Sequence, residues 1–272
     1  MDNGKRLEIS NLAESIAENN IASNKVDLIK IADNQSITII DGHYEHYFVG
    51  QLVFDCGDFF IHLNYDQLSD KDSPRTRFTL AHELGHYFIK EHCSLLKKGI
   101  SLHKATMEGN GKSPFEREAN FFASNLLMPA NRFVNLSAEF EPGIDSILNL
   151  KSIFSSSIES TAIRYTELDI TPCFLIKWQE DITSRYIGFS QSFSILTGIT
   201  SRPVIKVNTD YMQNTFNLLS TLDIETDYSV EKTTLSKWLP TIKPNSMKDF
   251  RCTEQTYKLG NYGGLTLLIL EP

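Results

Sequence analysis

The stretch FTLAHELGHYF, residues 78–88, constrains the fold of this chain more than any other part of its sequence. It holds His82, Glu83 and His86 in the order H-E-x-x-H. Residues four apart lie about 40° apart around a helix and one turn along it, so a helix lets both imidazoles face one ion. Glu83 then lies about 60° to the other side of His86, within reach of a water on that ion. The spacing therefore predicts a helix that carries two metal ligands and a general base.

Zinc is the metal that this pattern favours. In catalytic sites zinc usually has three protein ligands and keeps a fourth position for water. It lowers the pKa of that water towards about 7, and Glu83 can accept the proton while the water attacks a carbonyl. Because H-E-x-x-H also arises by chance, the rest of the sequence has to supply a third ligand.

The surrounding sequence supports a helix packed beside a small sheet. Ser73 and Pro74 form an N-cap and a first helical position, which predicts a helix from about 74 to 90. Gly85 inside it costs up to about 1 kcal/mol of helix propensity, which indicates that another element packs closely there. Three segments rich in β-branched and aromatic residues precede the helix, and we expect them to form an antiparallel sheet: 36–40, 48–55 and 59–65.

The third ligand has several candidates downstream of the motif: Glu91, His92, His103, Glu108, Glu116 and Glu118. His92 follows His86 by six residues and so does not fit HExxHxxGxxH. A second helix should start at Ser113-Pro114 and end before Pro129. On its helical wheel, Glu116 and Asn120 share one border of the apolar stripe, and Glu118 lies on the opposite edge.

Glu116 has two competing interpretations. With Ser113 it spells S-x-x-E, a capping box in which the glutamate bonds the N-cap amide. Alternatively it is the third metal ligand. Asn120, one turn later, favours ligation, because a metal-bound histidine usually donates its other N–H to an oxygen acceptor.

Together, RFTLAHELGH (77–86) and EREANFFASNLLMP (116–129) resemble the ImmA/IrrE family of gluzincin-like metallopeptidases, over roughly residues 7–168. The resemblance implies a zinc-dependent endopeptidase that cleaves a helix-turn-helix repressor of the xenobiotic-response-element type. It makes His82, His86 and Glu116 the zinc ligands and Glu83 the base. Asn120 stands where many zinc peptidases have aspartate, so its amide can accept a hydrogen bond but adds no negative charge.

Two further residues are candidates for contacts with substrate. His103, in the polar segment 91–112 that we expect to be a loop, is a candidate for stabilising an oxyanion. Strand 59–65 is expected to be a sheet edge that binds substrate by β-augmentation, with Asn64 adding a side-chain contact.

The whole chain is predicted to be α+β. A zincin-like metallopeptidase domain of helices and a small sheet should span 1–168. A smaller α+β domain, sensory or substrate-binding, should span 169–272, where some relatives carry a GAF-like domain. Within it, PCFLIKW, RYIGFS, PVIKV and GLTLLIL are predicted to be strands, and residues 209–221 are predicted to form a helix. The net charge of −8 gives no general surface for nucleic acid, and no apolar run reaches the roughly 20 residues of a membrane span. Four scattered cysteines favour a reducing cytoplasm.

Two other functions remain open on the sequence alone. The same domain can serve as a non-catalytic scaffold that binds a repressor or a partner in a toxin–antitoxin type system. It can also be a zinc hydrolase of another substrate class, because this chemistry attacks amides generally.

Overall fold

The computed structural model of the protein describes most of the chain, namely residues 1–22, 24–100, 102, 113–179, 184–201, 228–239, 249–260 and 263–271. The chain divides into two compact units. Unit 1 comprises Met1–Phe133 and Lys151–Ser157, and unit 2 comprises Val134–Leu150 and Ile158–Pro272. Among the described residues, no helix is both long and apolar enough to span a bilayer.

The division into units differs in position from the predicted boundary at 168. Helices α6 (Ala130–Ser137) and α7 (Ile144–Phe154) each have residues in both units, and α8 (Ile158–Glu167) belongs to unit 2. The sequence had grouped all three with the peptidase domain. The functional domain boundaries therefore stay a prediction, with one domain at 1–168 and the other at 169–272. The α+β class of the chain is confirmed.

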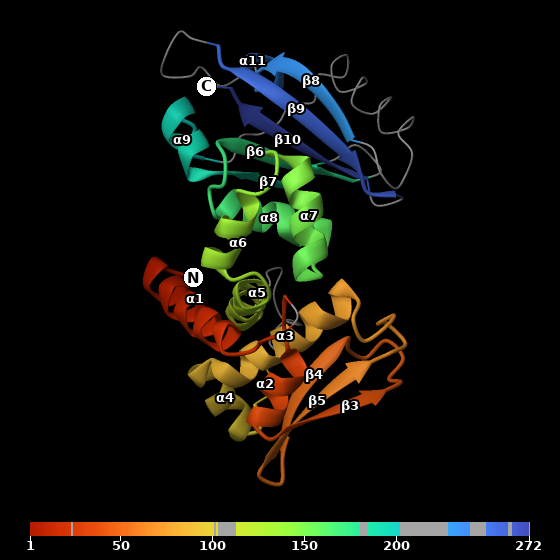
Figure 1. The fold of residues 1–272 in the computed structure, drawn as a ribbon. Coiled ribbons are helices and arrows are strands. Elements are labelled where there is room, and N and C mark those ends of the chain that lie inside the picture. The colour runs from red at the N-terminus through yellow and green to blue at the C-terminus, as the bar shows by residue number, and fades with distance from the viewer. Residues whose placement is uncertain are drawn as a thin grey trace. The chain divides into compact units, whose positions relative to one another are not determined.

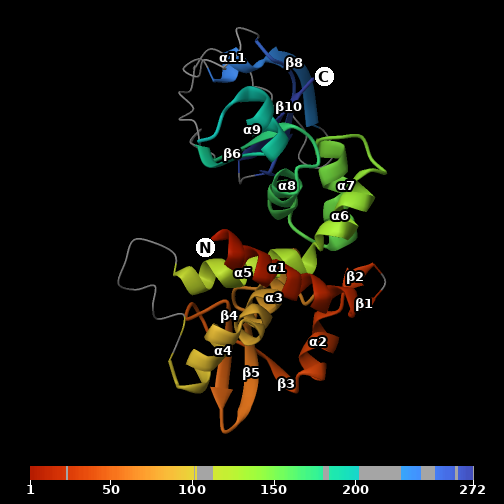
Figure 2. The same cartoon turned by 90° about the vertical axis from the view of Figure 1, so that its left-hand side faces the viewer.

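Helices α1 (Asn3–Glu18), α3 (Pro74–Phe88) and α5 (Pro114–Leu127) pack together in unit 1, with α5 in contact with both of the others (Figures 1 and 2). A shorter helix, α2 (Leu28–Asn34), follows the two-residue strands β1 (Ile21–Ala22) and β2 (Lys25–Val26). The core of unit 1 is made of the apolar stripes of these helices and one face of the sheet. This packing brings α3 and α5, which carry the predicted ligands, into direct contact.

The helix that carries H-E-x-x-H begins as predicted. The Ser73 hydroxyl accepts a hydrogen bond from the Thr76 N–H at 3.2 Å, and Pro74 occupies the first turn. It ends at Phe88, within two residues of the predicted end, and after Ile89 leaves the helical conformation α4 (Lys90–Lys97) starts at once. The first part of the predicted loop 91–112 is therefore helical, and most of its remainder lies outside the described residues.

The sheet of unit 1 is mixed rather than purely antiparallel. Its order is β3-β5-β4, where β3 is Ile37–Gly42, β4 is Gly50–Asp55 and β5 is Asp58–Asn64. Strand β5 pairs with β4 antiparallel and with β3 parallel. The expectation that strand 59–65 is a sheet edge is therefore wrong, because both of its sides are occupied. Among the described strands, the one that lies next to α3 and pairs on one side only is β4.

Unit 2 contains a five-stranded antiparallel sheet of order β7-β6-β10-β9-β8 (Figure 1). The strands are β6 (Cys173–Trp178), β7 (Ser184–Phe189), β8 (Tyr228–Thr234), β9 (Arg251–Lys258) and β10 (Gly264–Leu270). The predicted strands PCFLIKW, RYIGFS and GLTLLIL are confirmed within a residue or two. The predicted strand PVIKV and helix 209–221 lie outside the described residues.

Helices cover both faces of this second sheet. On one face, Phe174, Ile176 and Trp178 of β6 form an apolar cluster with residues of α9 (Gln191–Thr197) and α11 (Leu235–Trp238). On the other face, Lys177 forms an ion pair with Glu159 of α8. Because neighbouring residues of a strand point to opposite faces, the alternation along β6 accounts for both layers.

Candidate metal centre

Three predicted ligands come together where α3 meets α5. The side-chain nitrogens of His82 and His86 and the carboxylate of Glu116 lie within 4.8 Å of one another. His82 and His86 project from successive turns of α3, and Glu116 projects from the first turns of α5. Both imidazoles are buried, and the Glu116 side chain is only 18% exposed.

Gly85 allows this close approach of the two helices. A Cβ atom at Gly85 would lie 3.1 Å from the Phe122 ring and 3.3 Å from the backbone of Ala119, both on α5. Such contacts are tighter than ordinary van der Waals distances. The close packing that Gly85 predicted is confirmed, and it lets Glu116 reach the histidines.

The distances within the cluster suit a tetrahedral metal ion. His82 Nε2 lies 3.1 Å from His86 Nε2 and 3.2 Å from one Glu116 oxygen, while His86 Nε2 lies 3.6 Å from the other oxygen. Ligands at the zinc distances of about 2.0–2.1 Å in tetrahedral geometry are about 3.3 Å apart. The chain therefore has two imidazoles and a carboxylate at separations that fit one tetrahedral metal ion.

Asn120 orients the first histidine. Its side-chain oxygen lies 2.9 Å from His82 Nδ1, and because an amide oxygen only accepts, Nδ1 donates. The Nε2 atom of a neutral His82 then presents its lone pair to the cluster. Burial opposes the charged form of His82, but the carboxylates of Glu116 and Glu83 outweigh it and raise the pKa of His82.

His86 contacts His92, and His92 in turn contacts Glu118. The sequence did not predict either contact. His86 Nδ1 lies 3.1 Å from Nδ1 of His92 on α4, and His92 Nε2 lies 3.1 Å from a carboxylate oxygen of Glu118 on α5. Burial, followed by the electrostatic effect of the neighbouring His86 imidazole, lowers the pKa of His92 to about 3, so the His92 imidazole is neutral. The helical wheel placed Glu118 away from Glu116, but it could not show that α4 starts at residue 90 and brings His92 between the helices.

The predicted base is also fixed by the fold. Glu83 is buried, and its Oε2 accepts a hydrogen bond of 2.8 Å from the backbone N–H of Leu52 on β4. The carboxylate therefore lies between the ligand helix and the open side of the sheet. No sequence pattern identifies Leu52, because the contact depends on which strand lies beside α3.

Glu116 makes the contacts of a ligand. Ser113 caps α5 by accepting a hydrogen bond from the Phe115 N–H at 3.3 Å, whereas a capping box uses the N–H of the third helical residue. The Glu116 carboxylate lies beside the histidines. The geometry favours the second of the two interpretations left open by the sequence.

The two predicted substrate contacts have different outcomes. His103 lies outside the described residues. Asn64 has no exposed surface, and its amide bonds four backbone groups of the segment around it: it donates to the carbonyls of Glu45 and Phe48 and accepts from the N–H groups of Tyr44 and Asp66. Asn64 therefore holds the connection between β3 and β4, and we remove it from the substrate contacts.

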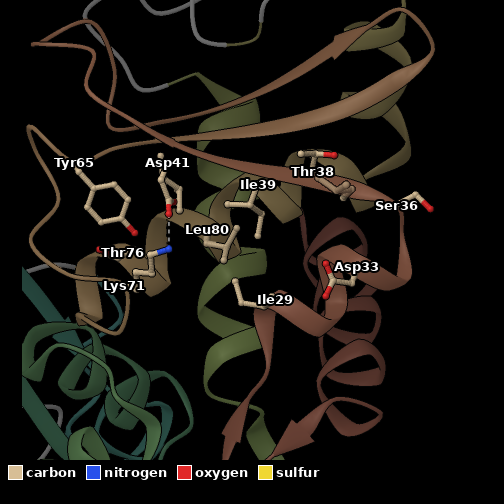
Figure 3. Close-up of a pocket in the computed structure, with 12 residues that line it drawn as sticks. Ile29, Asp33, Ser36, Thr38, Ile39, Asp41, Tyr65, Lys71, Thr76 and Leu80 are labelled. Atoms are coloured by element: carbon tan, nitrogen blue, oxygen red, sulfur yellow. Dashed lines mark ion pairs between the residues drawn. The ribbon is translucent and has the colours of Figure 1, made fainter.

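A cavity of about 610 Å³ lies elsewhere in unit 1. It is lined by residues of α2, β3 and the first half of α3, and its lining includes an ion pair between Lys71 and Asp41 near Tyr65 (Figure 3). None of the three cluster residues lines this cavity. The candidate metal site and this cavity are therefore two separate places in unit 1, and the site is identified from its ligand atoms alone.

Comparison with known proteins agrees with this geometry. Residues 45–166 match the model of a peptidase family, the IrrE N-terminal-like domain. None of the curated proteins matches. Among solved structures, a Mycobacterium tuberculosis transcriptional regulator is similar in fold, with 10% identity, a TM-score of 0.62, and coverage of 96% of this chain and 74% of that chain. The match contains all three cluster residues, and residues 45–166 of this protein are therefore similar to the IrrE N-terminal-like domain of the ImmA/IrrE family.

Proposed function

We propose that this protein is a zinc-dependent endopeptidase that cleaves a regulatory protein. The observation that carries the proposal is the convergence of His82, His86 and Glu116 at distances that fit one tetrahedral ion. Two imidazoles with a carboxylate are a common ligand set for catalytic zinc. A peptidase family model that covers the cluster supports the same reaction class.

The roles of the chain's own groups follow from their positions. His82, His86 and Glu116 would hold the ion, and the bound zinc would supply the Lewis acidity that acidifies water and polarises a carbonyl. Glu83, one residue after His82, accepts the proton of the attacking water. The hydrogen bond from Leu52 holds the Glu83 carboxylate in place for this transfer. Asn120 keeps His82 in the tautomer whose Nε2 lone pair would be available to the ion.

Strand β4 is the proposed docking position for the substrate. It pairs only with β5 within the described sheet, and it lies against α3. An extended peptide can add to such an open side through backbone hydrogen bonds. The contact between Leu52 and Glu83 places this strand beside the proposed base. This proposal replaces strand 59–65, which has no open side.

The proposed substrate is a helix-turn-helix repressor of the xenobiotic-response-element type, whose cleavage would derepress a stress or mobile-element regulon. The family resemblance supports this choice. The similar Mycobacterium tuberculosis protein, described as a transcriptional regulator, supports a role in transcription. The proposed location is the cytoplasm, where such a repressor acts.

Co-expression with a repressor encoded beside the gene tests the proposal. We expect one zinc per chain by elemental analysis and a cut repressor by mass spectrometry. Glu83→Gln should bind zinc and leave the repressor intact, because the amide cannot take the proton. Glu18→Gln, the same change at an exposed position on α1, is the matched control and should cut normally.

The same experiment distinguishes the proposed peptidase from the alternative function, a non-catalytic regulator. A non-catalytic regulator would bind the repressor and leave it intact in both the wild type and Glu83→Gln. Cleavage by Glu83→Gln at the wild-type rate would contradict the assigned base. A protein without zinc after purification in zinc-containing buffer would contradict the metal centre itself.

A further inference from the structure

A chain of two hydrogen bonds runs from the metal cluster to a carboxylate behind it. His92, which is fully buried, lies between His86 and Glu118, at 3.1 Å from each. The three residues come from three different helices: α3, α4 and α5. Both ring nitrogens of His92 are therefore engaged, one towards the cluster and one away from it.

The direction of these hydrogen bonds follows from the carboxylate. A carboxylate only accepts, so His92 Nε2 donates to Glu118. A neutral imidazole has one N–H, so His92 Nδ1 is an acceptor, and His86 Nδ1 must donate to it. The Nε2 atom of His86 then has its lone pair directed at His82 and Glu116.

We propose that His92 and Glu118 are positioning residues that hold His86 in its metal-binding tautomer, an inference that rests on the proposed metal centre. Hydrogen bonds to the outer nitrogen of a ligand histidine fix its tautomer and raise its basicity. Among the residues that the structure describes, the acceptor at His82 Nδ1 is the neutral amide of Asn120. The Nδ1 partner of His82 is thus neutral, whereas a negatively charged group, Glu118, lies behind His86 and acts through His92.

A purely structural role makes a different prediction. If His92 and Glu118 only tied α4 to α5, their loss would lower the stability of the metal-free and metal-loaded protein alike. If they position His86, their loss should instead lower zinc affinity. It should also change the tautomer of His86, even in the metal-free protein. These two readouts do not depend on cleavage activity.

Three variants of the full chain test the inference. His92→Leu removes the acceptor for His86 Nδ1 at similar volume. His92→Asn keeps an oxygen acceptor near the position of Nδ1. His62→Leu is the matched control, since His62 is a partly buried histidine of β5 that bonds the Tyr44 hydroxyl away from the cluster.

Zinc affinity is measured by competition with a chromophoric chelator, and the His86 tautomer by ¹⁵N NMR of the metal-free protein. We expect His92→Leu to weaken zinc binding by roughly 10–100-fold and to lose the Nδ1–H tautomer of His86. His92→Asn should restore most of both, and His62→Leu should resemble the wild type.

The outcomes separate this inference from the proposed function. Wild-type zinc affinity and tautomer in His92→Leu would overturn the positioning role while leaving the metal centre intact. Equal loss in His92→Leu and His92→Asn would also overturn it, because the acceptor would then be irrelevant. A wild-type protein that binds no zinc would overturn the metal centre. A zinc-binding wild type that cuts no repressor would overturn only the proposed substrate or reaction.

Discussion

Glu83 on α3 accepts a 2.8 Å hydrogen bond from the backbone N–H of Leu52 on β4. This contact joins the ligand helix to the sheet at the proposed catalytic residue. It makes one side chain responsible both for proton transfer and for satisfying a buried N–H group. The two tasks can be separated by substitution.

Glu83→Gln and Glu83→Ala should differ in stability although both remove the base. Glutamine keeps an oxygen acceptor for the Leu52 N–H, whereas alanine leaves that group unsatisfied and opens a cavity. An unsatisfied buried donor costs about 1–3 kcal/mol, so Glu83→Ala should be less stable than Glu83→Gln by about that amount. Urea denaturation of the metal-free variants measures the difference. Equal stabilities would show that the Leu52 contact contributes nothing.

Asn120 should control zinc affinity through His82. Asn120→Asp provides a charged acceptor at the same place and should tighten zinc binding. Asn120→Leu removes the acceptor and should weaken binding by roughly 10–100-fold. Chelator competition measures both, and the rank order Asp, Asn, Leu is the expected result. A Leu variant that binds zinc as tightly as the wild type would show that His82 needs no support from this position.

Gly85→Ala should destabilise unit 1 although alanine is the better helix former. The gain in propensity is at most about 1 kcal/mol, while overpacking a tight interface typically costs about 1–3 kcal/mol. Phe122, the nearest side chain, is fully buried, and the backbone of Ala119 lies almost as close. Thermal unfolding should show a lower Tm.

Gly4→Ala is the matched control for this prediction. Gly4 lies on α1, and a Cβ atom there would meet only the Asp2 side chain, at 3.3 Å. The same substitution should therefore be neutral or stabilising. If both alanine variants gained stability, the close approach of α5 to α3 would not be what requires glycine at position 85.

Asn64→Ala should destabilise the segment between β3 and β4. It removes four hydrogen bonds, two donated by the Asn64 amide to backbone carbonyls and two accepted by its oxygen from backbone N–H groups. The expected loss of unfolding free energy is about 3 kcal/mol. Gln67→Ala is the control, because Gln67 donates to the same carbonyls of Glu45 and Phe48 from a partly exposed position. Its loss should be about 1 kcal/mol or less. Comparable losses in the two variants would contradict the role assigned to Asn64.

The sequence by itself determined what depends on neighbours within one helix. The spacing of His82, Glu83 and His86 sets their common direction on α3, and Ser73-Pro74 sets where that helix begins. Helical periodicity also placed Glu116 and Asn120 on one border of α5. These features follow from backbone geometry and short-range hydrogen bonds, so they can be read without the fold.

The tertiary structure decided what depends on contacts between distant segments. Whether Glu116 caps its helix or joins the metal cluster depended on how closely α5 packs against α3 at Gly85. The order of the strands made β4, and not β5, the open side beside Glu83. The position of His92 depended on the break between α3 and α4. Pairing order and helix packing are set by burial of surface contributed by the whole unit, and no local pattern contains that information.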